Sequence, residues 1–512
     1  MNQGLLKGTL YVTVAALISK SLGSLFRIPM QNIAGDEVLG IFMLVHPLYM
    51  VVLTLSVAGI PLAISKLISQ ARARGSYSEI NGVYITASIL ALSFGAFGFI
   101  VLAGFSGPIS TAIGGPSTQP AILVVSLSLL VAPYTAVYRG FFQGFGEMRP
   151  TAFSQVTDQS VRVGLILVVA FVLIQQGVAK PWVAAGIMAG SSLGALASLF
   201  YLRLTFVRSS LRPVSEERYQ FSTFLRLARR ILKLSFPIAV GSLAVMLMNL
   251  ADSFTIPASL KAFGQHEIYD LYGVYGRGLS LVQIATVFSA SLVLPMIPRF
   301  TETDSARTIH IMNRAQRLNH LVSWPAAIGA MALALPLNLA LFGNLQGTLV
   351  FSILGFSSLF NAFAVLGTGI LTGINLQRKA AYIVLVAAAV KVPLNILLVS
   401  NIGLVGAAIS SVLVYGLLLS ANMVLIKKHS PVFTIFPTGS GTYIFASCLM
   451  GAVLGIPTLF AGIVSWTRIE AFLYVAAALV AGIAIYSGII WRFNGAEEFS
   501  GLPGFNKIFS KS

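Results

Sequence analysis

Long apolar runs separated by short polar connections extend from one end of the chain to the other. Each run is long enough to cross about 30 Å of hydrocarbon as a helix. A bilayer requires the backbone to satisfy its own hydrogen bonds, and the alternation typical of barrel strands is absent. The pattern therefore predicts an all-α polytopic membrane protein with about 14 transmembrane helices, near residues 8–33, 38–69, 79–105, 118–141, 151–175, 181–205, 234–257, 271–297, 318–342, 348–374, 379–400, 402–426, 440–464 and 469–490.

One stretch of this pattern occurs twice, at Arg139–Val168 and at Thr368–Leu397. In each copy a polar, glycine-containing turn separates two apolar segments. A shift of 229 residues superposes two glycines of the turn and, deep in the second segment, places Arg162 on Lys391. Internal repeats of this kind are how many transporters are built. We therefore expect two homologous halves that face each other across a cavity, each with a cation near mid-membrane.

The repeat sets the expected domains. Residues 1–206 form an N-terminal six-helix lobe, and residues 234–430 form a C-terminal six-helix lobe. Residues 207–233 form a cytoplasmic link, whose second part, Tyr219–Lys233, is amphipathic and is expected to lie in the membrane interface. Residues 431–512 have no counterpart in the repeat and add two transmembrane helices and a cytoplasmic tail.

Composition agrees with a membrane protein, since 56% of residues are hydrophobic and only 9% are charged. The 33 Lys and Arg against 15 Asp and Glu give a formal net charge of +18. Outside the spans, these cations fall almost entirely in every second connection, and such connections lie on one side of the membrane. Only Lys180, Lys261 and Arg468 fall in connections on the opposite side. The positive-inside rule then places both termini in the cytoplasm of a multi-pass cell-membrane protein. The charge is explained by topology, so nucleic acid is not expected as a partner.

Charges inside the spans are the main functional signal, because each costs about 2.5–3.5 kcal/mol on insertion scales. Five cations face two acids in these segments: Lys20, Arg27, Arg162, Arg277 and Lys391, against Asp158 and Asp252. The excess of cation favours an anionic substrate.

The first span continues through its two cations with no small-residue cleavage site, so we expect it to be retained and not removed as a signal peptide.

The two acids suggest ion pairs. Asp158 and Arg162 are spaced i, i+4 on one helical face, which favours a structural salt bridge. Asp252 lies at a depth similar to that of Arg27, so these two form either a gating pair or a plain structural pair. Both alternatives stay open from the sequence.

Three other cations are candidates for substrate contact. Arg277 is flanked by glycines and has no partner close in sequence. Lys391 contacts either substrate or backbone carbonyls, and Lys20 either contacts substrate or extends its ammonium toward the cytoplasm. Arginine suits phosphate because its planar fork binds two oxygens at once.

Signatures of enzymes are missing from the sequence. It contains no metal-spaced set of His, Cys and carboxylates, no nucleophile elbow and no phosphate-binding Walker loop. The single cysteine, Cys448, excludes an intramolecular disulfide framework. We therefore expect a transporter with no cofactor and no metal. A membrane-embedded glycosyltransferase is disfavoured because no catalytic acid or large outer loop is present.

Four stretches carry a resemblance to a known family: SKSLGSLFR at 19–27, GIPLAISKLISQARARG at 59–75, RGFFQGFGEMRP at 139–150, and the YGRGLS stretch around Arg277. The chain resembles the stage V sporulation protein B / polysaccharide biosynthesis family. That family belongs to the multidrug/oligosaccharidyl-lipid/polysaccharide exporter (MOP) superfamily, which includes the MurJ-type lipid II flippases. The resemblance implies two six-helix lobes arranged in a V, with two further helices at the C-terminus.

The resemblance also implies a function. It suggests a monomeric flippase for an undecaprenyl-pyrophosphate-linked cell-wall precursor, either lipid II or a polysaccharide unit; the alternative is a cation-coupled multidrug exporter of the same superfamily. The flippases use arginines of helices 1 and 8 on the pyrophosphate, which correspond here to Lys20, Arg27 and Arg277. This chain departs from the pattern by a lysine at 20 and by the lack of an arginine in the middle of its second span. A clamp of four arginines therefore cannot be carried over intact.

The charge distribution predicts the position of the last connection before the two added spans. A reporter fused after Gly439 should read out as cytoplasmic, because Lys427 and Lys428 precede it and belong to the basic side. A reporter fused there that reads out as extracellular would contradict the assignment of the last two spans.

Overall fold

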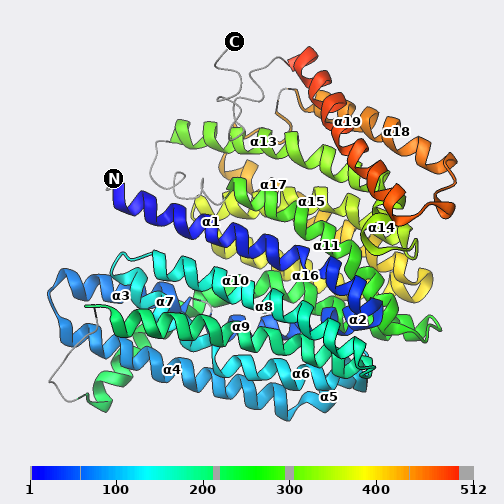
Figure 1. Ribbon diagram of the computed structural model, residues 1–512. Helices are drawn as coiled ribbons and strands as arrows, with labels where there is room; N and C mark the ends of the chain where they lie inside the picture. Colours follow the sequence, from blue (N-terminus) through cyan, green and yellow to red (C-terminus); the bar gives the residue numbers. More distant parts are fainter. Residues whose placement is uncertain (1–2, 58, 212–218, 294–304, 438, 495–512) are drawn as a thin grey trace. The chain divides into compact units, whose positions relative to one another are not determined.

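Every regular element in the described part of the chain is a helix, as the apolar pattern predicts (Figure 1). The computed structural model describes residues 3–57, 59–211, 219–293, 305–437 and 439–494. The α-helices are α1 (Gln3–Leu25), α2 (Arg27–Val57), α3 (Ile60–Ala73), α4 (Tyr77–Gly104), α5 (Ser106–Ala112), α6 (Gln119–Ser126), α7 (Ala132–Gly144), α8 (Arg149–Gln175), α9 (Lys180–Arg208), α10 (Phe221–Ala262), α11 (Ile268–Val293), α13 (Ser305–Ala332), α14 (Ala334–Phe342), α15 (Thr348–Gly373), α16 (Gln377–Ile402), α17 (Leu404–His429), α18 (Ser440–Phe460) and α19 (Arg468–Asn494). Short 3-10 turns cover Pro116–Thr118, Leu127–Leu130 and Ile463–Ser465.

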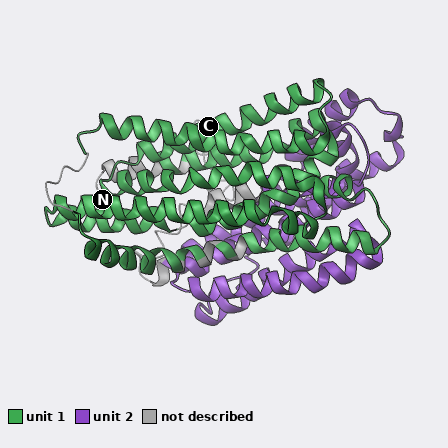
Figure 2. Cartoon of the chain, turned by 90° about the horizontal axis from the view of Figure 1, so that it is seen from below, with its two compact units in different colours: residues 1–273 green, residues 274–512 purple. Residues whose placement is uncertain are grey.

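The chain divides into two compact units, unit 1 (Met1–Gly273) and unit 2 (Val274–Ser512), coloured separately in Figure 2. Within unit 1, α8 packs against α1 and α9, α3 packs against α7, and α10 packs against α2, α3 and α4. Within unit 2, α17 packs against α15 and α16, α13 against α15 and α18, and α14 against α19. The predicted domain boundaries at 206, 233 and 430 stay predictions.

The repeat seen in the sequence has the same local backbone in both copies. One copy is α7, a turn and α8, and the other is α15, a turn and α16. Both turns contain a residue with positive φ at the equivalent place, Gly146 (φ 82°) and Asn375 (φ 62°). A shift of 229 residues relates two further pairs of positive-φ glycines, Gly35 with Gly264 and Gly114 with Gly343. Since this backbone region strongly favours glycine and asparagine, the shared positions show that the repeat extends beyond the stretch in which the sequences agree.

The spans are less regular than the sequence predicts. In the described residues, ten stretches are long and apolar enough to cross a membrane, or 11 if the bent pair Thr308–Ala332 and Ala334–Phe342 counts as one span; these two helices meet at 78°. The predicted second span, 38–69, is broken between α2 and α3. The predicted total of about 14 stays a prediction.

The amphipathic segment Tyr219–Lys233 does not form a separate helix. It is continuous with the predicted seventh span in α10, which contains 42 residues. At 1.5 Å per residue α10 is about 63 Å long, roughly twice the hydrocarbon thickness. No glycine or proline occurs between Phe221 and Phe236, and Pro237, which follows at the junction of the amphipathic and apolar parts, lies inside α10 without ending it. The expectation of an independent helix in the membrane interface is therefore corrected to an amphipathic first part of α10.

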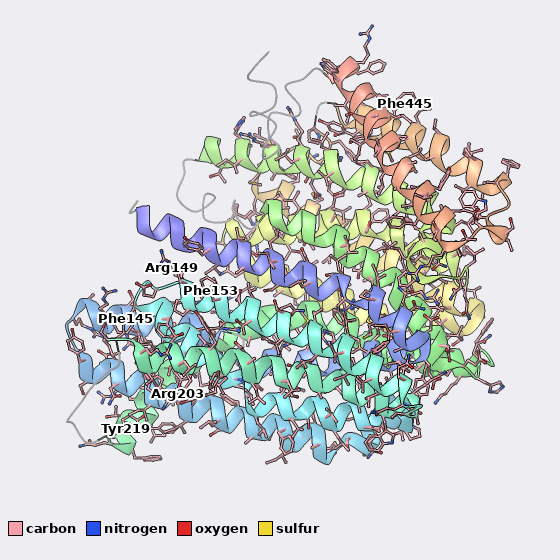
Figure 3. All side chains as sticks on the ribbon, viewed as in Figure 1. Phe145, Arg149, Phe153, Arg203, Tyr219 and Phe445 are labelled. Atoms are coloured by element: carbon pink, nitrogen blue, oxygen red, sulfur yellow. The ribbon has the colours of Figure 1, made fainter. Side chains whose placement is uncertain are left out.

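Basic side chains gather at one end of unit 1. Figure 3 labels Arg149 and Arg203 at this end, where α8 begins and α9 ends. The Arg149 guanidinium lies 5.5 Å from the centre of the Tyr11 ring, and Arg203 donates a hydrogen bond of 3.0 Å to the Tyr138 hydroxyl. The opposite end of α9 carries Lys180, which forms an ion pair of 2.6 Å with Glu37. Arg149 and Arg203 thus lie at one end of unit 1 and Lys180 at the other, and the side of the membrane that each end faces stays a prediction.

A glycine contact brings two helices of unit 1 together. A Cβ on Gly40 of α2 would overlap the carbonyl oxygen of Tyr269, and a Cβ on Gly273 would overlap that of Asp36. The two backbones therefore lie closer together than a side chain at either of these glycine positions would allow. Small residues let helices approach in a membrane, where packing and not the hydrophobic effect holds helices together.

Substitution at Gly40 tests this contact. Gly40→Val should lower the thermal unfolding temperature of the purified protein by several degrees or reduce its folded yield, because overpacking costs roughly 1–3 kcal/mol and here the obstacle is backbone. The control is Gly416→Val on α17, where no atom lies within 4 Å of an added Cβ. Equal unfolding temperatures for the two variants would show that α2 can move away from Tyr269 at little cost.

Candidate functional site

The seven charged residues singled out from the sequence all lie within the described part of the chain. Unit 1 holds Lys20, Arg27, Asp158, Arg162 and Asp252, and unit 2 holds Arg277 and Lys391.

Arg27 is the first residue of α2 and is buried, with 3% of its surface exposed. Its position follows from Pro29, which lacks the N–H that would bond to the Leu25 carbonyl, so α1 ends at Leu25. The Nε and Nη1 atoms of Arg27 are buried and have no hydrogen-bond partner among the described residues. No ion pair joins Arg27 to Asp252 there. A buried guanidinium without a counter-ion is costly, and an anionic group would lower that cost.

A row of aromatic rings begins at Phe26, beside Arg27, and continues along α2. Phe26 meets Phe42 edge to face at 5.6 Å, Phe42 stacks on His46 at 5.2 Å, and His46 lies 6.3 Å from Tyr49 between ring centres. The His46 Nδ1 and the Tyr49 hydroxyl are buried without a partner among the described residues. The Tyr49 hydroxyl faces Arg162 on α8, although its geometry falls short of a hydrogen bond. Polar groups thus extend from Arg27 to the neighbourhood of α8.

Asp158 of α8 lies between two arginines. Its Oδ1 is 2.9 Å from Nη2 of Arg162, and its Oδ2 is 3.9 Å from Nη2 of Arg139. Arg139 is oriented by two hydroxyls, because its Nε donates to Ser154 at 2.9 Å and its Nη2 donates to Ser198 at 3.0 Å. From the sequence, Arg139 is counted with the cations outside the spans, because it lies at the end of the predicted span 118–141, so this contact was not predicted. No spacing rule connects residues 139 and 158; only the position of Arg139 at the start of the repeated stretch marked it.

Asp252 and Lys20 differ in their surroundings. Asp252 on α10 is 1% exposed and is followed by the buried Ser253, whose hydroxyl lies 3.5 Å from that of Tyr272. Lys20 on α1 is exposed. Among the described residues, no group of three or more His, Cys, Asp or Glu side chains is arranged to hold a metal ion.

Arg277 of α11 is enclosed within unit 2, with 1% of its surface exposed. Its Nη1 donates to Oδ1 of Asn344 at 2.7 Å and to Oδ1 of Asn338 at 3.4 Å, and its guanidinium lies 5.2 Å from the centre of the Phe342 ring. Asn338 is itself fixed, since its Nδ2 donates to the Gln346 carbonyl and to the Thr348 hydroxyl, both at 3.0 Å. Neutral amide oxygens therefore hold Arg277 in one orientation.

Lys391 of α16 is fully buried in unit 2, at the position that the repeat pairs with Arg162. Its Nζ lies 5.7 Å from the centre of the Tyr415 ring on α17, within the range of a cation–π contact. The side chain of Arg162 is 16% exposed, so the two paired cations differ in burial. The depth of each cation in the membrane stays a prediction.

The cluster around Asp158 yields a prediction about stability. Asp158→Asn should lower the thermal unfolding temperature more than Arg162→Gln does. The first change leaves two arginines without their acid, on the order of 3 kcal/mol for a buried pair, whereas the second leaves Asp158 beside Arg139. Unfolding of both variants in detergent measures the difference. A larger effect for Arg162→Gln would mean that Arg139 does not compensate Asp158.

Known proteins similar to this chain are membrane proteins of one group. The chain is 28% identical to the uncharacterized membrane protein YabM of Bacillus subtilis (98% of this chain, 95% of the relative). It is 26% identical to the lipid II flippase MurJ of B. subtilis (99% and 98%) and 26% identical to the stage V sporulation protein B of that organism (84% and 85%).

Solved structures show the same fold at low identity. An inward closed lipid II flippase MurJ matches with a TM-score of 0.68 at 12% identity, covering 94% of this chain and 99% of the other. An inward-facing MATE multidrug resistance transporter of the MOP superfamily matches with 0.64 at 14% identity, covering 81% and 96%. The family model described as polysaccharide biosynthesis protein matches residues 5–304. The resemblance inferred from the sequence is thereby confirmed: the chain belongs to the polysaccharide biosynthesis protein family and has the helical fold of MOP-superfamily transporters.

Proposed function

We propose that this chain is a flippase, which moves an undecaprenyl-pyrophosphate-linked saccharide across the cytoplasmic membrane by alternating access. Lipid II and a polysaccharide unit are the two candidate cargoes. The similarity to MurJ, a lipid II flippase, supports this choice. The observation that carries it is Arg27, a buried guanidinium whose Nε and Nη1 find no partner among the described residues.

The balance of charge inside unit 1 supports an anionic cargo. Arg27, Arg139 and Arg162 are opposed by Asp158 and Asp252, so cation exceeds acid among these five groups. Inside a low-dielectric protein an excess charge favours a ligand of opposite sign far more than it does in water. A cationic drug would meet repulsion from the same groups.

Arg277 supplies a second candidate contact with the cargo. Two of its hydrogen-bond acceptors, Asn338 and Asn344, are neutral, and hydrogen bonds to charged acceptors are roughly twice as strong. A phosphate oxygen therefore competes favourably with an amide oxygen for this guanidinium. The proposal includes Lys20 and Lys391 as further cations of the cavity predicted from the sequence. It also includes a monomer with both termini in the cytoplasm.

A cation-coupled multidrug exporter is the alternative, because such transporters share the fold. Cationic drugs need acids in the binding cavity, and Asp158 is already occupied by two arginines. A single reconstituted system can distinguish the two functions. Vesicles that contain the protein should move lipid II and should not accumulate or expel a cationic dye in response to an ion gradient.

Substitution of the arginines tests the proposed contacts. Arg27→Ala should slow lipid II movement in vesicles by about tenfold or more, because a hydrogen bond to a charged group contributes about 1.5–3 kcal/mol. Arg27→Lys should also slow it, since lysine keeps the charge but lacks the planar fork. The same order is expected for Arg277→Ala and Arg277→Lys.

The matched control is Arg492→Ala on α19, where the side chain is exposed. Its transport rate should equal that of the unmodified protein. If Arg27→Ala and Arg277→Ala both transport at the unmodified rate, the assigned contacts are wrong and Lys20 or Lys391 becomes the better candidate.

A further inference from the structure

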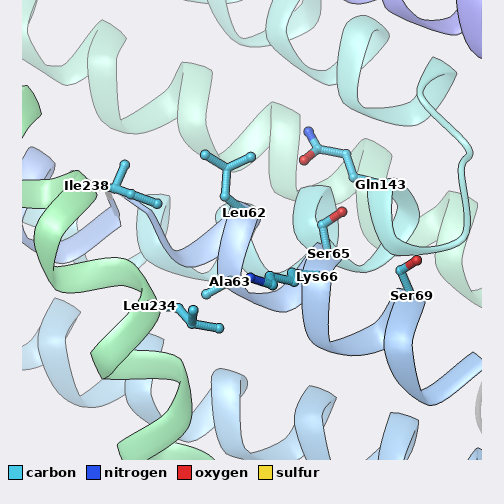
Figure 4. Close-up of a pocket in the computed structure, with 8 residues that line it drawn as sticks. All are labelled: Leu62, Ala63, Ser65, Lys66, Ser69, Gln143, Leu234 and Ile238. Carbon is cyan, nitrogen blue, oxygen red and sulfur yellow. The ribbon is translucent and has the colours of Figure 1, made fainter. Parts of the chain in front are cut away.

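A second site lies in unit 1, in a pocket of about 480 Å³ between α3, α7 and α10 (Figure 4). Half of the residues that line it have apolar side chains and half have polar side chains. The lining residues are Leu62, Ala63, Ser65, Lys66, Ser69, Gln143, Leu234 and Ile238. None of them belongs to the group of intramembrane charges described above.

Close helix contacts fix the walls of this pocket. At one end α3 touches α10, because a Cβ on Gly59 would lie 2.5 Å from the Ser235 carbonyl oxygen. At the other end Nη2 of Arg230 donates to Oε1 of Gln70 at 2.9 Å. The α3–α7 wall is equally tight, since a Cβ on Gly144 would lie 2.7 Å from Cβ of Ile68. The pocket is thus part of the packed fold.

The two long walls change from charged to apolar along their length. Residues four apart share one helical face, so each wall is a single stripe. From the charged end to the apolar end the stripes are Gln70, Lys66 and Leu62 on α3, and Arg230, Leu234 and Ile238 on α10. Leu62 is 59% exposed and Ile238 is 37% exposed, so the apolar end is open. This gradient matches an amphiphile whose charged head lies beside Lys66 and whose apolar part leaves past Leu62.

Lys66 is exposed, and no carboxylate lies within ion-pair distance of its ammonium in the part of the chain that the structure describes. The acid beside the charged end, Glu79, is held by Arg74 at 2.6 Å and by Arg230 at 3.4 Å. Within the pocket, one ammonium is accompanied by the neutral polar side chains of Ser65, Ser69 and Gln143.

We propose that this pocket binds the headgroup of an anionic glycerophospholipid with a hydroxylated head, of the phosphatidylglycerol type. Lys66 holds the singly charged phosphodiester, and Ser65, Ser69 and Gln143 hydrogen-bond to the hydroxyls. Leu62, Leu234 and Ile238 cover the glycerol and the first carbons of the chains. With the orientation proposed above, the lipid belongs to the cytoplasmic leaflet, whose anionic lipids attract basic residues.

The lining distinguishes this lipid from two other phosphates. A pyrophosphate carries more charge and favours several cations or the fork of an arginine, whereas this pocket offers one point charge. Free phosphate has no apolar part, so it would leave the apolar end of the pocket uncovered. The site therefore takes a structural or regulatory lipid and not the cargo, which makes it independent of the substrate in the proposed function.

Native mass spectrometry of the full-length protein tests this assignment. The protein is purified with equal amounts of phosphatidylglycerol and phosphatidylcholine, and the bound copies of each lipid are counted. The unmodified protein should retain phosphatidylglycerol preferentially. Lys66→Gln should lower its retention roughly fivefold, since a single basic residue near a membrane surface contributes about that factor. The control Lys428→Gln, an exposed lysine at the end of α17, should not change it.

A second variant and two competitors make the test decisive. Ser69→Trp should fill the pocket and lower retention of phosphatidylglycerol while Lys66 is intact. Inorganic phosphate should not displace the lipid. Retention that is equal in the unmodified protein, Lys66→Gln and Ser69→Trp would overturn the proposal. Displacement of phosphatidylglycerol by equimolar undecaprenyl pyrophosphate would also overturn it, because the pocket would then be a cargo site.

Discussion

A charge inside a membrane protein needs a partner, and this requirement organises the interior of both units. The described intramembrane charges meet it in different ways. Asp158 lies between two arginines, Arg162 and Arg139, and so forms a compensated cluster. Arg277 donates from Nη1 to the amide oxygens of Asn338 and Asn344. The buried Nε and Nη1 of Arg27 have no hydrogen-bond partner among the described residues. An external anion would therefore satisfy donors of Arg27 that the described residues leave unsatisfied.

This difference separates structural charges from functional ones by physical cost. Removing one member of a compensated cluster strands the others, so such groups are constrained by folding. A cation that is already uncompensated strands nothing when it is removed, so its burial in the protein interior points to a ligand. Lys66 differs from these groups, because it is exposed at the edge of its pocket and a lipid phosphate would replace water beside it.

Glycine decides how closely the helices that carry these charges approach. Gly40 and Gly273 let α2 meet the first turn of α11, and Gly59 lets α3 meet α10. Contacts at backbone distance leave little freedom for the side chains beside them. The Lys66 pocket borders one of these contacts, so its shape is set by backbone packing and not by mobile side chains. In a lipid environment, where burial of apolar surface gives little preference for one arrangement, such contacts carry much of the specificity.

The amino-acid sequence by itself determined the helical class and the repeat, because these depend on local hydrophobicity and on residue spacing. It also identified Asp158 with Arg162, since an i, i+4 pair meets on any helix. Tertiary structure decided the rest. Arg139 reaches Asp158, and Arg277 reaches asparagines 61 and 67 residues away, through helix packing that no local pattern encodes. The amphipathic segment before the seventh span was expected to be separate and is part of α10, which continues through Pro237 at the junction. Arg27 and Asp252 lie at similar predicted depths, but depth gives the position only along the membrane normal. Which helix faces meet, and therefore which charges pair, is set by packing between helices that are distant in sequence.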